Sequence, residues 1–357
     1  MVVAFVAKET EPGETRVAAV PETVKALAKS GIEVCVEQGA GLAAGFLDQE
    51  YADAGAQVVG FDALGNADLV LRVLPPREGT AEVDALRAGA ILVSSLQPML
   101  RLPLVAALAE KQVTTIALDL VPRITRAQKM DILSSQATAA GYQAVLLAAV
   151  ALPKFFPLLM TAAGTIAPAK VFVLGAGVAG LQAIATARRL GAQVEANDIR
   201  PAVKEQVESL GAKFVDTGTP PEAEGAGGYA RETSAEYQRK QREILAAHVA
   251  AADVVITTAA IPGRKAPVLV TRDMVAAMRR GSVIVDLAAA MGGNVEGSRP
   301  GETVTTENGV KILGESNLAA QVASDASRMF ARNVAALLGE FVKDGKIALD
   351  FNNEVLA

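Results

Sequence analysis

The chain has 357 residues, of which 51% are hydrophobic and 20% are charged, enough length for two domains and enough apolar residues for a sizeable core. This composition excludes disordered, collagen-like and low-complexity proteins. Lys and Arg number 34 against 39 Asp and Glu, a net charge of −5, so a nucleic acid is not expected as a partner. One cysteine and one histidine, Cys35 and His248, cannot build an internal disulfide or a Cys/His metal site.

Short apolar runs alternate with helical patterns from the start of the chain. Each run is almost continuously apolar, which is typical of parallel strands covered by helices on both faces. Between the first two runs, Pro21 opens a helical pattern and Gly31 follows its end. The start shows no basic region, long apolar stretch or cleavage site of a signal peptide, so export is not expected. The single cysteine indicates a reducing compartment. Strands of the first domain are predicted over 2–7, 32–37, 56–59, 68–73, 90–95 and 113–118.

A long helix rich in Ala and Leu is predicted over 131–152 and is expected to cross between two domains. The apolar region 132–169 is interrupted by polar residues and prolines, so no membrane-spanning helix is expected there. The last helix, predicted over 324–343, has apolar residues at helical spacing and is expected to return to the first domain. Strands of the second domain are predicted over 171–174, 192–198, 212–216, 253–259, 282–288 and 310–314.

A glycine-rich motif follows the first strand of the second series and opens a helix. In this context, three glycines at this spacing indicate a dinucleotide-binding turn rather than glycines that serve a turn alone. Gly175 allows the tight turn, Gly177 lets the backbone approach a pyrophosphate, and Gly180 lets the helix pack closely on the strand. The anion then lies at the positive end of the helix. The motif reads Gly175-Ala176-Gly177-Val178-Ala179-Gly180.

An acidic residue follows the motif at the expected distance. Asp198 lies 23 residues after Gly175, at the end of the next strand. Its carboxylate can accept hydrogen bonds from the adenosine ribose hydroxyls and repels a 2′-phosphate, which favours NAD over NADP. Arg200 leaves this preference open, because a guanidinium there can pair with such a phosphate. We therefore expect an α/β protein with two Rossmann-like domains and parallel sheets, joined by long interdomain helices around a cleft. The expected domains are 1–130 plus 322–357, and 131–321.

Polar residues gather in the sequence where the long helix begins. Gln128, Asp131 and Ser134 are spaced by three, so on a helix they would form a polar stripe, with Arg123 shortly before it. Such a set suits recognition of a carboxamide and its ribose, and the alternative is a solvated helix face with a capping residue. A long loop over 216–235, rich in glycine and proline, is predicted to be a lid or, alternatively, a surface excursion.

Longer segments of the sequence carry a family resemblance. They include GETRVAAVP (13–21), RAQKMDILSSQATAAGYQAV (126–145), ITTAAIPGRKAPVLVT (256–271) and GSVIVDLAAAMGGNVE (281–296). With the glycine motif, these segments look like the soluble, NAD(H)-binding alpha subunits of proton-translocating NAD(P) transhydrogenases, over nearly the whole chain. The resemblance implies hydride transfer between NADH and NADP⁺ coupled to proton movement across a membrane. It also implies a homodimer held at the cytoplasmic face of the inner membrane by partner subunits that span the membrane and bind NADP(H).

The resemblance also implies roles for individual residues. The family pattern at the nicotinamide end of NAD(H) is matched by Arg123, Gln128, Asp131 and Ser134. The tyrosine of a mobile loop that closes over nucleotide is matched by Tyr229. The segment at the adenosine ribose is matched by Asp198, Ile199 and Arg200. Further nucleotide contacts are matched by Gly228, Gln241 and Ala260.

Alanine dehydrogenases are similar in fold and remain the first alternative. In that family a lysine in a K-V-K-E-P stretch binds the oxo acid and a histidine in an L-H-L stretch is the acid/base; the matching positions here hold Leu74 and Gln97. The only histidine, His248, falls in a different helical stretch, where we expect a structural role. Hydride exchange between two nicotinamides moves no proton at the reacting carbons and needs no base. A second alternative is a catalytically silent NAD-binding regulatory subunit.

Overall fold

The structure is a computed structural model that describes residues 1–218, 235–260 and 265–356, without the side chains of 235–238. Tertiary contacts divide the chain into two compact units. Unit 1 comprises Met1–Gln136 and Ala319–Ala357, and unit 2 comprises Ala137–Leu318. The final helix therefore belongs to the same unit as the N-terminus.

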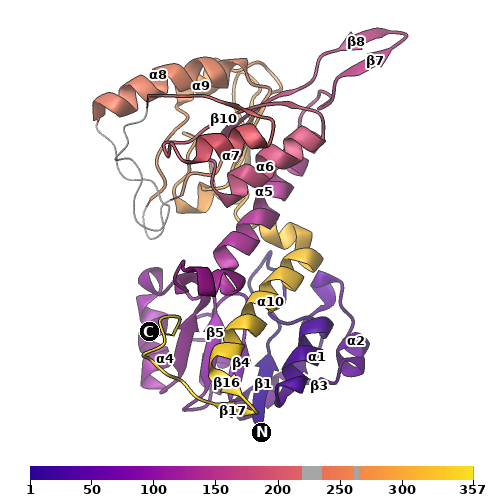
Figure 1. The fold of residues 1–357 in the computed structure, drawn as a ribbon, viewed down its shortest axis with the longest axis vertical. Helices are drawn as coiled ribbons and strands as arrows, with labels where there is room; N and C mark the ends of the chain where they lie inside the picture. The colour runs from indigo at the N-terminus through magenta and orange to yellow at the C-terminus, as the bar shows by residue number, and fades with distance from the viewer. Residues whose placement is uncertain (219–234, 261–264, 357) are drawn as a thin grey trace. The chain divides into compact units, whose positions relative to one another are not determined.

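The sheet of unit 1 has six parallel strands in the order β3-β2-β1-β4-β5-β6 (Figure 1). Successive residues of a strand point to opposite faces, and both faces are apolar here. In β1, Ala4 and Val6 join one buried cluster, whereas Phe5 between them joins another. The strands are β1 (Val2–Val6), β2 (Ile32–Glu37), β3 (Gln57–Val59), β4 (Leu69–Leu71), β5 (Ile91–Ser94) and β6 (Thr114–Ala117).

Helices cover both of these apolar faces. The cluster that contains Ala4 also includes residues of α1 and α10, and the cluster of Phe5 includes residues of α3 and α4. The α-helices of unit 1 are α1 (Pro21–Lys29), α2 (Asp48–Asp53), α3 (Ala81–Ala85), α4 (Leu102–Glu110) and α10 (Ala323–Phe341). The short 3₁₀ helices are η1 (Leu42–Ala44), η2 (Phe61–Asn66), η3 (Pro98–Leu100), η4 (Leu118–Leu120), η5 (Thr125–Met130) and η9 (Leu318–Val322), the last of which begins at the unit boundary.

The sheet of unit 2 has seven strands in the order β11-β10-β9-β12-β13-β15-β14. All neighbouring pairs are parallel except β14 with β15. The strands are β9 (Lys170–Leu174), β10 (Gln193–Asn197), β11 (Lys213–Phe214), β12 (Val254–Thr257), β13 (Val283–Asp286), β14 (Thr303–Thr305) and β15 (Lys311–Leu313). The helices are α6 (Val178–Arg189), α7 (Val203–Ser209), α8 (Ala235–Ala251), α9 (Arg272–Ala276) and the 3₁₀ turn η8 (Ala289–Met291). The expected α/β class with two mostly parallel sheets is confirmed.

The long helix α5 (Ile132–Ala151) starts in unit 1 and continues in unit 2. Within unit 2 it packs very closely on the start of α6. A Cβ added to Gly141 would lie 2.1 Å from the carbonyl oxygen of Ala179, so only glycine permits this approach. None of the helices within the described ranges combines the length and apolar character that a membrane span requires.

Three small features differ from the sequence expectation. The antiparallel edge strand β14 and the hairpin of β7 (Leu159–Thr161) and β8 (Gly164–Ile166) were not predicted. The last helix ends at Phe341 instead of continuing to 343, because the chain turns into the hairpin of β16 (Val342–Lys343) and β17 (Lys346–Ile347). Asp344 and Gly345 both have positive φ at this turn, which is the backbone that an Asp-Gly hairpin prefers.

Candidate functional site

The glycine turn between β9 and α6 has the geometry that its sequence predicts. Gly175 has a φ of +96°, and a Cβ there would lie 2.7 Å from the hydroxyl oxygen of Thr258. That hydroxyl donates a hydrogen bond of 2.9 Å to the carbonyl oxygen of Gly175. A Cβ added to Gly180 would lie 1.9 Å from the same carbonyl. These two glycines are therefore required for the turn and for the close packing of α6.

Gly177 differs from Gly175 and Gly180 because an added Cβ would not clash with the protein there. The nearest heavy atom to an added Cβ is Arg200 Nη2, at 3.8 Å. Gly177 is also the N-cap residue of α6, and no side chain caps this helix end. The first N–H groups of a helix attract anions, and an uncapped end leaves room for a ligand to do so. The residues present therefore fit the pyrophosphate of a dinucleotide.

Asp198 lies at the end of β10, next to this turn, and is 8% exposed. Its Oδ2 accepts hydrogen bonds from the backbone N–H of Ala176 at 2.7 Å and from Arg200 Nη2 at 2.8 Å. Its Oδ1 accepts from the backbone N–H and the Nε of Arg200, at 2.8 and 2.9 Å. Asp198 thus anchors the glycine turn and pairs with the guanidinium that could otherwise bind a 2′-phosphate. Ile199, between the two, is half-buried.

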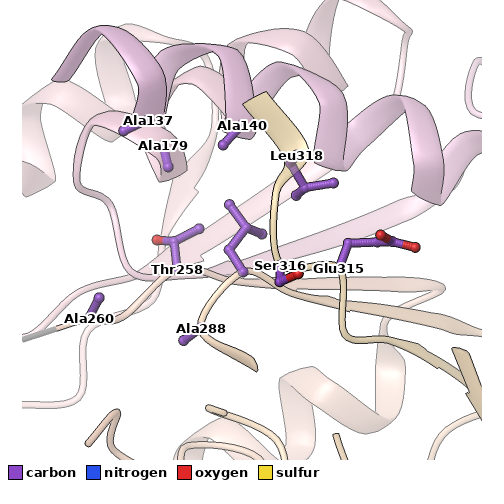
Figure 2. Close-up of a pocket in the computed structure, with 10 residues that line it drawn as sticks. Ala137, Ala140, Ala179, Thr258, Ala260, Ala288, Glu315, Ser316 and Leu318 are labelled. Atoms are coloured by element: carbon purple, nitrogen blue, oxygen red, sulfur yellow. The ribbon is translucent and has the colours of Figure 1, made fainter. Parts of the chain in front are cut away.

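A cavity of about 220 Å³ lies in unit 2 at the carboxyl ends of its strands (Figure 2). In the order β10-β9-β12, connections leave β9 and β12 toward opposite sides of the sheet, and such a switch point is where α/β sheets bind ligands. Figure 2 shows Ala137 and Ala140 of α5 above the cavity, with Thr258 and Ala288 below them. The cavity is lined by Ala137, Ala140, Ala179, Thr258, Ala260, Leu287, Ala288, Glu315, Ser316 and Leu318.

Of the residues around this cavity, sequence reasoning identified Ala260 and missed the others, including Glu315 and Ser316. The missed residues lie on α5, at the start of α6 and after β12, β13 and β15, and only strand order and helix packing bring them together. One signal was available: Thr258 comes directly after β12, and polar residues at the end of a buried parallel strand often face a ligand crevice.

A buried amide fixes the loop that lines the cavity after β12. Asn294 is fully buried; its Nδ2 donates to the carbonyl oxygens of Ala259 and Pro267, both at 2.8 Å, and its Oδ1 accepts from Ala259 N at 3.1 Å. Asp286, also fully buried, accepts from Asn294 N at 3.0 Å and from the Thr257 hydroxyl at 3.0 Å. Both ends of the segment that follows β12 are therefore held in place.

The other residues assigned to unit 2 are less informative. Gln241 lies on α8 and is buried, at 6% exposure. Gly228, Tyr229 and the predicted lid loop beyond 218 lie outside the described residues. Their roles stay predictions.

The polar stripe in unit 1 corrects the sequence expectation. Gln128 lies on η5, which ends at Met130, and Asp131 has an extended backbone (φ −74°, ψ 93°) before α5 begins. The residues spaced by three therefore do not share one helix face. Asp131 instead caps α5, because its Oδ1 accepts from Ser134 N at 2.9 Å and its Oδ2 from the Ser134 hydroxyl at 2.6 Å. Arg123 and Gln128 are exposed, and Asp131 and Ser134 are half-buried.

The equivalent switch point in unit 1, between β1 and β4, holds buried charges. Glu9, after β1, accepts from Val73 N at 2.7 Å and pairs with Arg72 Nη2 at 3.1 Å. Arg72, after β4, is 1% exposed and also contacts Glu82. Burial raises the pKa of Glu9, whereas Arg72 and the Val73 hydrogen bond lower it. The effect of burial is the larger one, so the pKa is raised overall. Since these side chains occupy the carboxyl ends of both strands, unit 2 is the candidate nucleotide-binding unit.

His248, on α8, has a structural environment. Its Nδ1 lies 2.6 Å from Glu195 Oε2, and its ring lies 5.4 Å from that of Phe172, centroid to centroid. Glu195 also pairs with Lys213 at 3.1 Å. The histidine therefore connects α8 to the sheet, as expected from the sequence.

This pair predicts a pH-dependent contribution to stability. Partial burial raises the pKa of Glu195, but hydrogen bonds from His248 and Lys213 outweigh it and hold the pKa below its usual value of 4.5. A pKa that is lower in the folded state stabilises the protein above the unfolded-state pKa, and the effect is lost as the pH falls through the folded-state value. Glu195→Gln is expected to lower the free energy of unfolding by about 0.5 kcal/mol near neutral pH, a small value because Glu195 and His248 are partly exposed. In strong acid, it should not change this free energy. Urea unfolding at both pH values measures this.

The control is Glu243→Gln, the same change at an exposed position in the middle of α8. It should be neutral at both pH values. An equal loss of stability for Glu195→Gln in acid and at neutral pH would contradict the ionic contribution.

Comparison with known proteins establishes the family. The family model for the alanine dehydrogenase/PNT N-terminal domain matches residues 5–140, and the family model for the C-terminal domain matches residues 144–357. The chain belongs to the alanine dehydrogenase/PNT family. Within it, an NAD(P) transhydrogenase subunit alpha protein of Rhodospirillum rubrum is 50% identical over 347 residues, which cover 95% of this chain and 90% of that protein.

Two further relatives separate the branches of the family. The crystal structure of transhydrogenase from Sinorhizobium meliloti has a TM-score of 0.90 at 47% identity, covering 99% of this chain and 96% of that one. Alanine dehydrogenase 1 of Staphylococcus aureus is only 30% identical over 373 residues, which cover 100% of this chain and 92% of that protein. The comparisons therefore favour a transhydrogenase alpha subunit over an alanine dehydrogenase.

The two positions at which alanine dehydrogenases carry catalytic side chains agree with this assignment. Leu74 is partly buried against the apolar core of unit 1. Gln97 is exposed in a left-handed conformation (φ +49°), and its backbone N–H donates to Asp119 Oδ2 at 3.0 Å. Neither side chain can act as an acid or a base near neutral pH.

Proposed function

We propose that this chain binds NAD(H) in unit 2 and is the subunit of a proton-translocating NAD(P) transhydrogenase that exchanges hydride with NADP(H) on a partner subunit. The observation that carries the proposal is a glycine, Gly177, that the protein's own packing does not require, at an uncapped helix N-terminus with the carboxylate of Asp198 beside the turn. A chemical argument supports the proposal. Hydride transfer between nicotinamides needs no base, and Leu74 and Gln97 provide none at the two positions where alanine dehydrogenases carry catalytic side chains.

In this proposal, unit 2 holds the adenosine and pyrophosphate parts of the dinucleotide. The N–H groups at the start of α6 receive the pyrophosphate, whose charge the helix dipole stabilises. Asp198 accepts hydrogen bonds from the ribose hydroxyls. Its ion pair with Arg200 prevents the guanidinium from pairing with a 2′-phosphate. The assigned contacts are Gly175, Ala176, Gly177, Val178, Gly180, Asp198, Ile199, Arg200, Gly228, Gln241 and Ala260.

The polar residues of unit 1 are proposed to orient the nicotinamide end. Bound NADH supplies the hydride from its nicotinamide ring. The exposed amide of Gln128 is suited to pair with a carboxamide, and within the described part of the chain no side-chain hydrogen bond engages it. Orientation of this kind can account for a large part of a hydride-transfer rate without proton transfer. The assigned residues are Arg123, Gln128, Asp131, Ser134 and, over the bound nucleotide, Tyr229.

The partners belong to the same proposal. The relatives are named as alpha subunits, which implies further subunits. We assign these the membrane span and NADP(H), and place the chain at the cytoplasmic face of the inner membrane as a homodimer. The β7–β8 hairpin, which projects from unit 2 in Figure 1, supports a dimer because Met160 on it is 78% exposed and Leu158, directly before it, is 54% exposed. An isolated two-stranded hairpin is marginally stable in water, so a second copy that covers it is stabilising.

Two measurements test the proposed function. The isolated chain is titrated with NADH and with NADPH, and a clear preference for NADH is expected. Hydride transfer is then measured after reconstitution with the partner subunits. NADH oxidation by the chain alone with pyruvate and ammonia would instead establish an amino-acid dehydrogenase. If the partner subunits transferred hydride normally without this chain, the chain would be a regulatory subunit instead.

Gln128→Asn tests the orientation role directly. The change keeps the amide but withdraws it by one methylene, so hydride transfer in the reconstituted enzyme should slow by about tenfold. The dissociation constant for NADH should change by less than about threefold, because orientation rather than affinity is lost. Thr125→Ser, a change of similar size at an exposed position on the same turn, is the control. An unchanged transfer rate would remove Gln128 from the mechanism.

A further inference from the structure

The turn that presents Gln128 is held against α10 by apolar contacts. Ala127 and Met130 of η5 are 1% and 0% exposed and belong to the same buried cluster as Phe330 and Val334 of α10. With these two residues facing inward, Gln128 faces solvent. Apolar packing fixes which side of η5 is exposed, but a direction-specific contact is needed to fix where the turn sits along α10.

Asn333 of α10 supplies that contact. It is 8% exposed, its Nδ2 donates to the carbonyl oxygen of Lys129 at 2.8 Å, and its Oδ1 accepts from the Ser135 hydroxyl at 2.7 Å. Lys129 lies before the backbone break at Asp131 and Ser135 lies after it. One planar amide therefore joins the two sides of the break and sets the distance between them.

A buried polar network supports Ser135 in turn. Gln136 Nε2 donates to the Ser135 hydroxyl oxygen and to the carbonyl oxygen of Ala326, both at 3.1 Å. Arg16 Nη1 donates to Gln136 Oε1 at 2.8 Å, and both carboxylate oxygens of Glu14 hold Arg16 at 2.6 and 2.8 Å. A satisfied network of this kind makes the local structure rigid.

We propose that Asn333 is a positioning residue for hydride transfer, which acts by holding Lys129 and Ser135 so that Gln128 and Asp131 keep their places. The inference rests on the proposed function, because that function assigns Gln128 and Asp131 to the nicotinamide end. Asn333 itself is not assigned a contact with nucleotide. Its two hydrogen bonds are made entirely within unit 1.

The test is Asn333→Asp in the chain reconstituted with its partner subunits. Aspartate keeps the oxygen that accepts from Ser135 but replaces the donor to the Lys129 carbonyl with a second oxygen. Hydride transfer in a single turnover should slow by about tenfold, as expected when a positioning contact is lost, while the dissociation constant for NADH stays within about twofold. Arg332→Gln, at the exposed neighbouring position on α10, should leave both quantities unchanged.

A double variant separates positioning from a merely structural role. If Asn333 acts through Gln128, then Asn333→Asp should add little to the loss already caused by Gln128→Asn. Multiplied losses in the double variant, or a single variant with the wild-type rate, would overturn the inference. Failure of the wild-type chain to bind NADH would instead reject the proposed function.

Ser135→Ala provides a milder variant if Asn333→Asp does not fold. It removes the bond to Asn333 and the bond from Gln136 Nε2, and it leaves the bond from Asn333 to Lys129. The expected loss in transfer rate is about fivefold, the equivalent of one neutral hydrogen bond. A wild-type rate here, in a folded protein that lacks the bond to Asn333, would also overturn the inference.

Discussion

Replacing Asp198 with asparagine should raise the affinity of the chain for NADPH relative to NADH by at least about tenfold. Asparagine keeps an oxygen that can accept from Ala176 N, so the glycine turn is retained. The carboxylate charge that repels a 2′-phosphate is lost, and the charge of Arg200, no longer neutralised by Asp198 at 2.8 Å, attracts that phosphate. Hydrogen bonds between charged groups contribute about 1.5–3 kcal/mol, which corresponds to about 10- to 100-fold in affinity.

Fluorescence titration of the isolated chain with both nucleotides measures the ratio of the two affinities. Glu195→Gln makes the same change of carboxylate to amide in β10, at a residue paired with His248, and should leave the ratio unchanged. A ratio for Asp198→Asn within about twofold of the wild-type value would place the ribose away from Asp198.

Gly180→Ala should disrupt both folding and nucleotide binding in unit 2. The new Cβ would lie 1.9 Å from the carbonyl oxygen of Gly175, so α6 must move away from the turn. Overpacking of this kind costs about 1–3 kcal/mol, and the displaced helix no longer presents its N-terminus to the pyrophosphate. We expect a lower midpoint of urea unfolding and a loss of NADH affinity of more than about tenfold.

Gly339→Ala is the matched control. Gly339 lies inside α10, and a Cβ there meets no atom within 4 Å. Since glycine is a poor helix former, alanine at this position should stabilise the chain by about 0.5–1 kcal/mol and leave NADH binding unchanged. A Gly180→Ala variant as stable as the wild type would contradict the close packing of α6 on the glycine turn.

The sequence was a good guide wherever the signal was local. Almost continuous apolar runs correctly predicted twelve strands, and Gly175 and Gly180 were assigned the turn and the close packing that the structure shows. The polar stripe was wrong as a helix face because a spacing of three residues implies a stripe only if the helix is continuous. Asp131 interrupts the helix, because its backbone is extended and its carboxylate caps the N-terminus of α5.

Two hairpins show different limits of local reasoning. The Asp344-Gly345 turn has a recognised sequence signal, and the apolar periodicity of α10 simply masked it. The β7–β8 hairpin has no such signal, and its exposed residues lack the alternation that marks a strand packed on a core. The cleft expected between the domains stays a prediction.

The sequence by itself determined that two parallel α/β sheets form and that one of them carries a dinucleotide turn, because strand periodicity and glycine spacing are properties of neighbouring residues. Tertiary structure decided the rest. It placed Thr258 and Glu315 at one cavity, brought Asp198 to the backbone N–H of Ala176, and put Asn333 between Lys129 and Ser135. These contacts depend on strand order and helix packing, which are set by the burial of apolar faces across the whole unit and leave no mark on the local pattern.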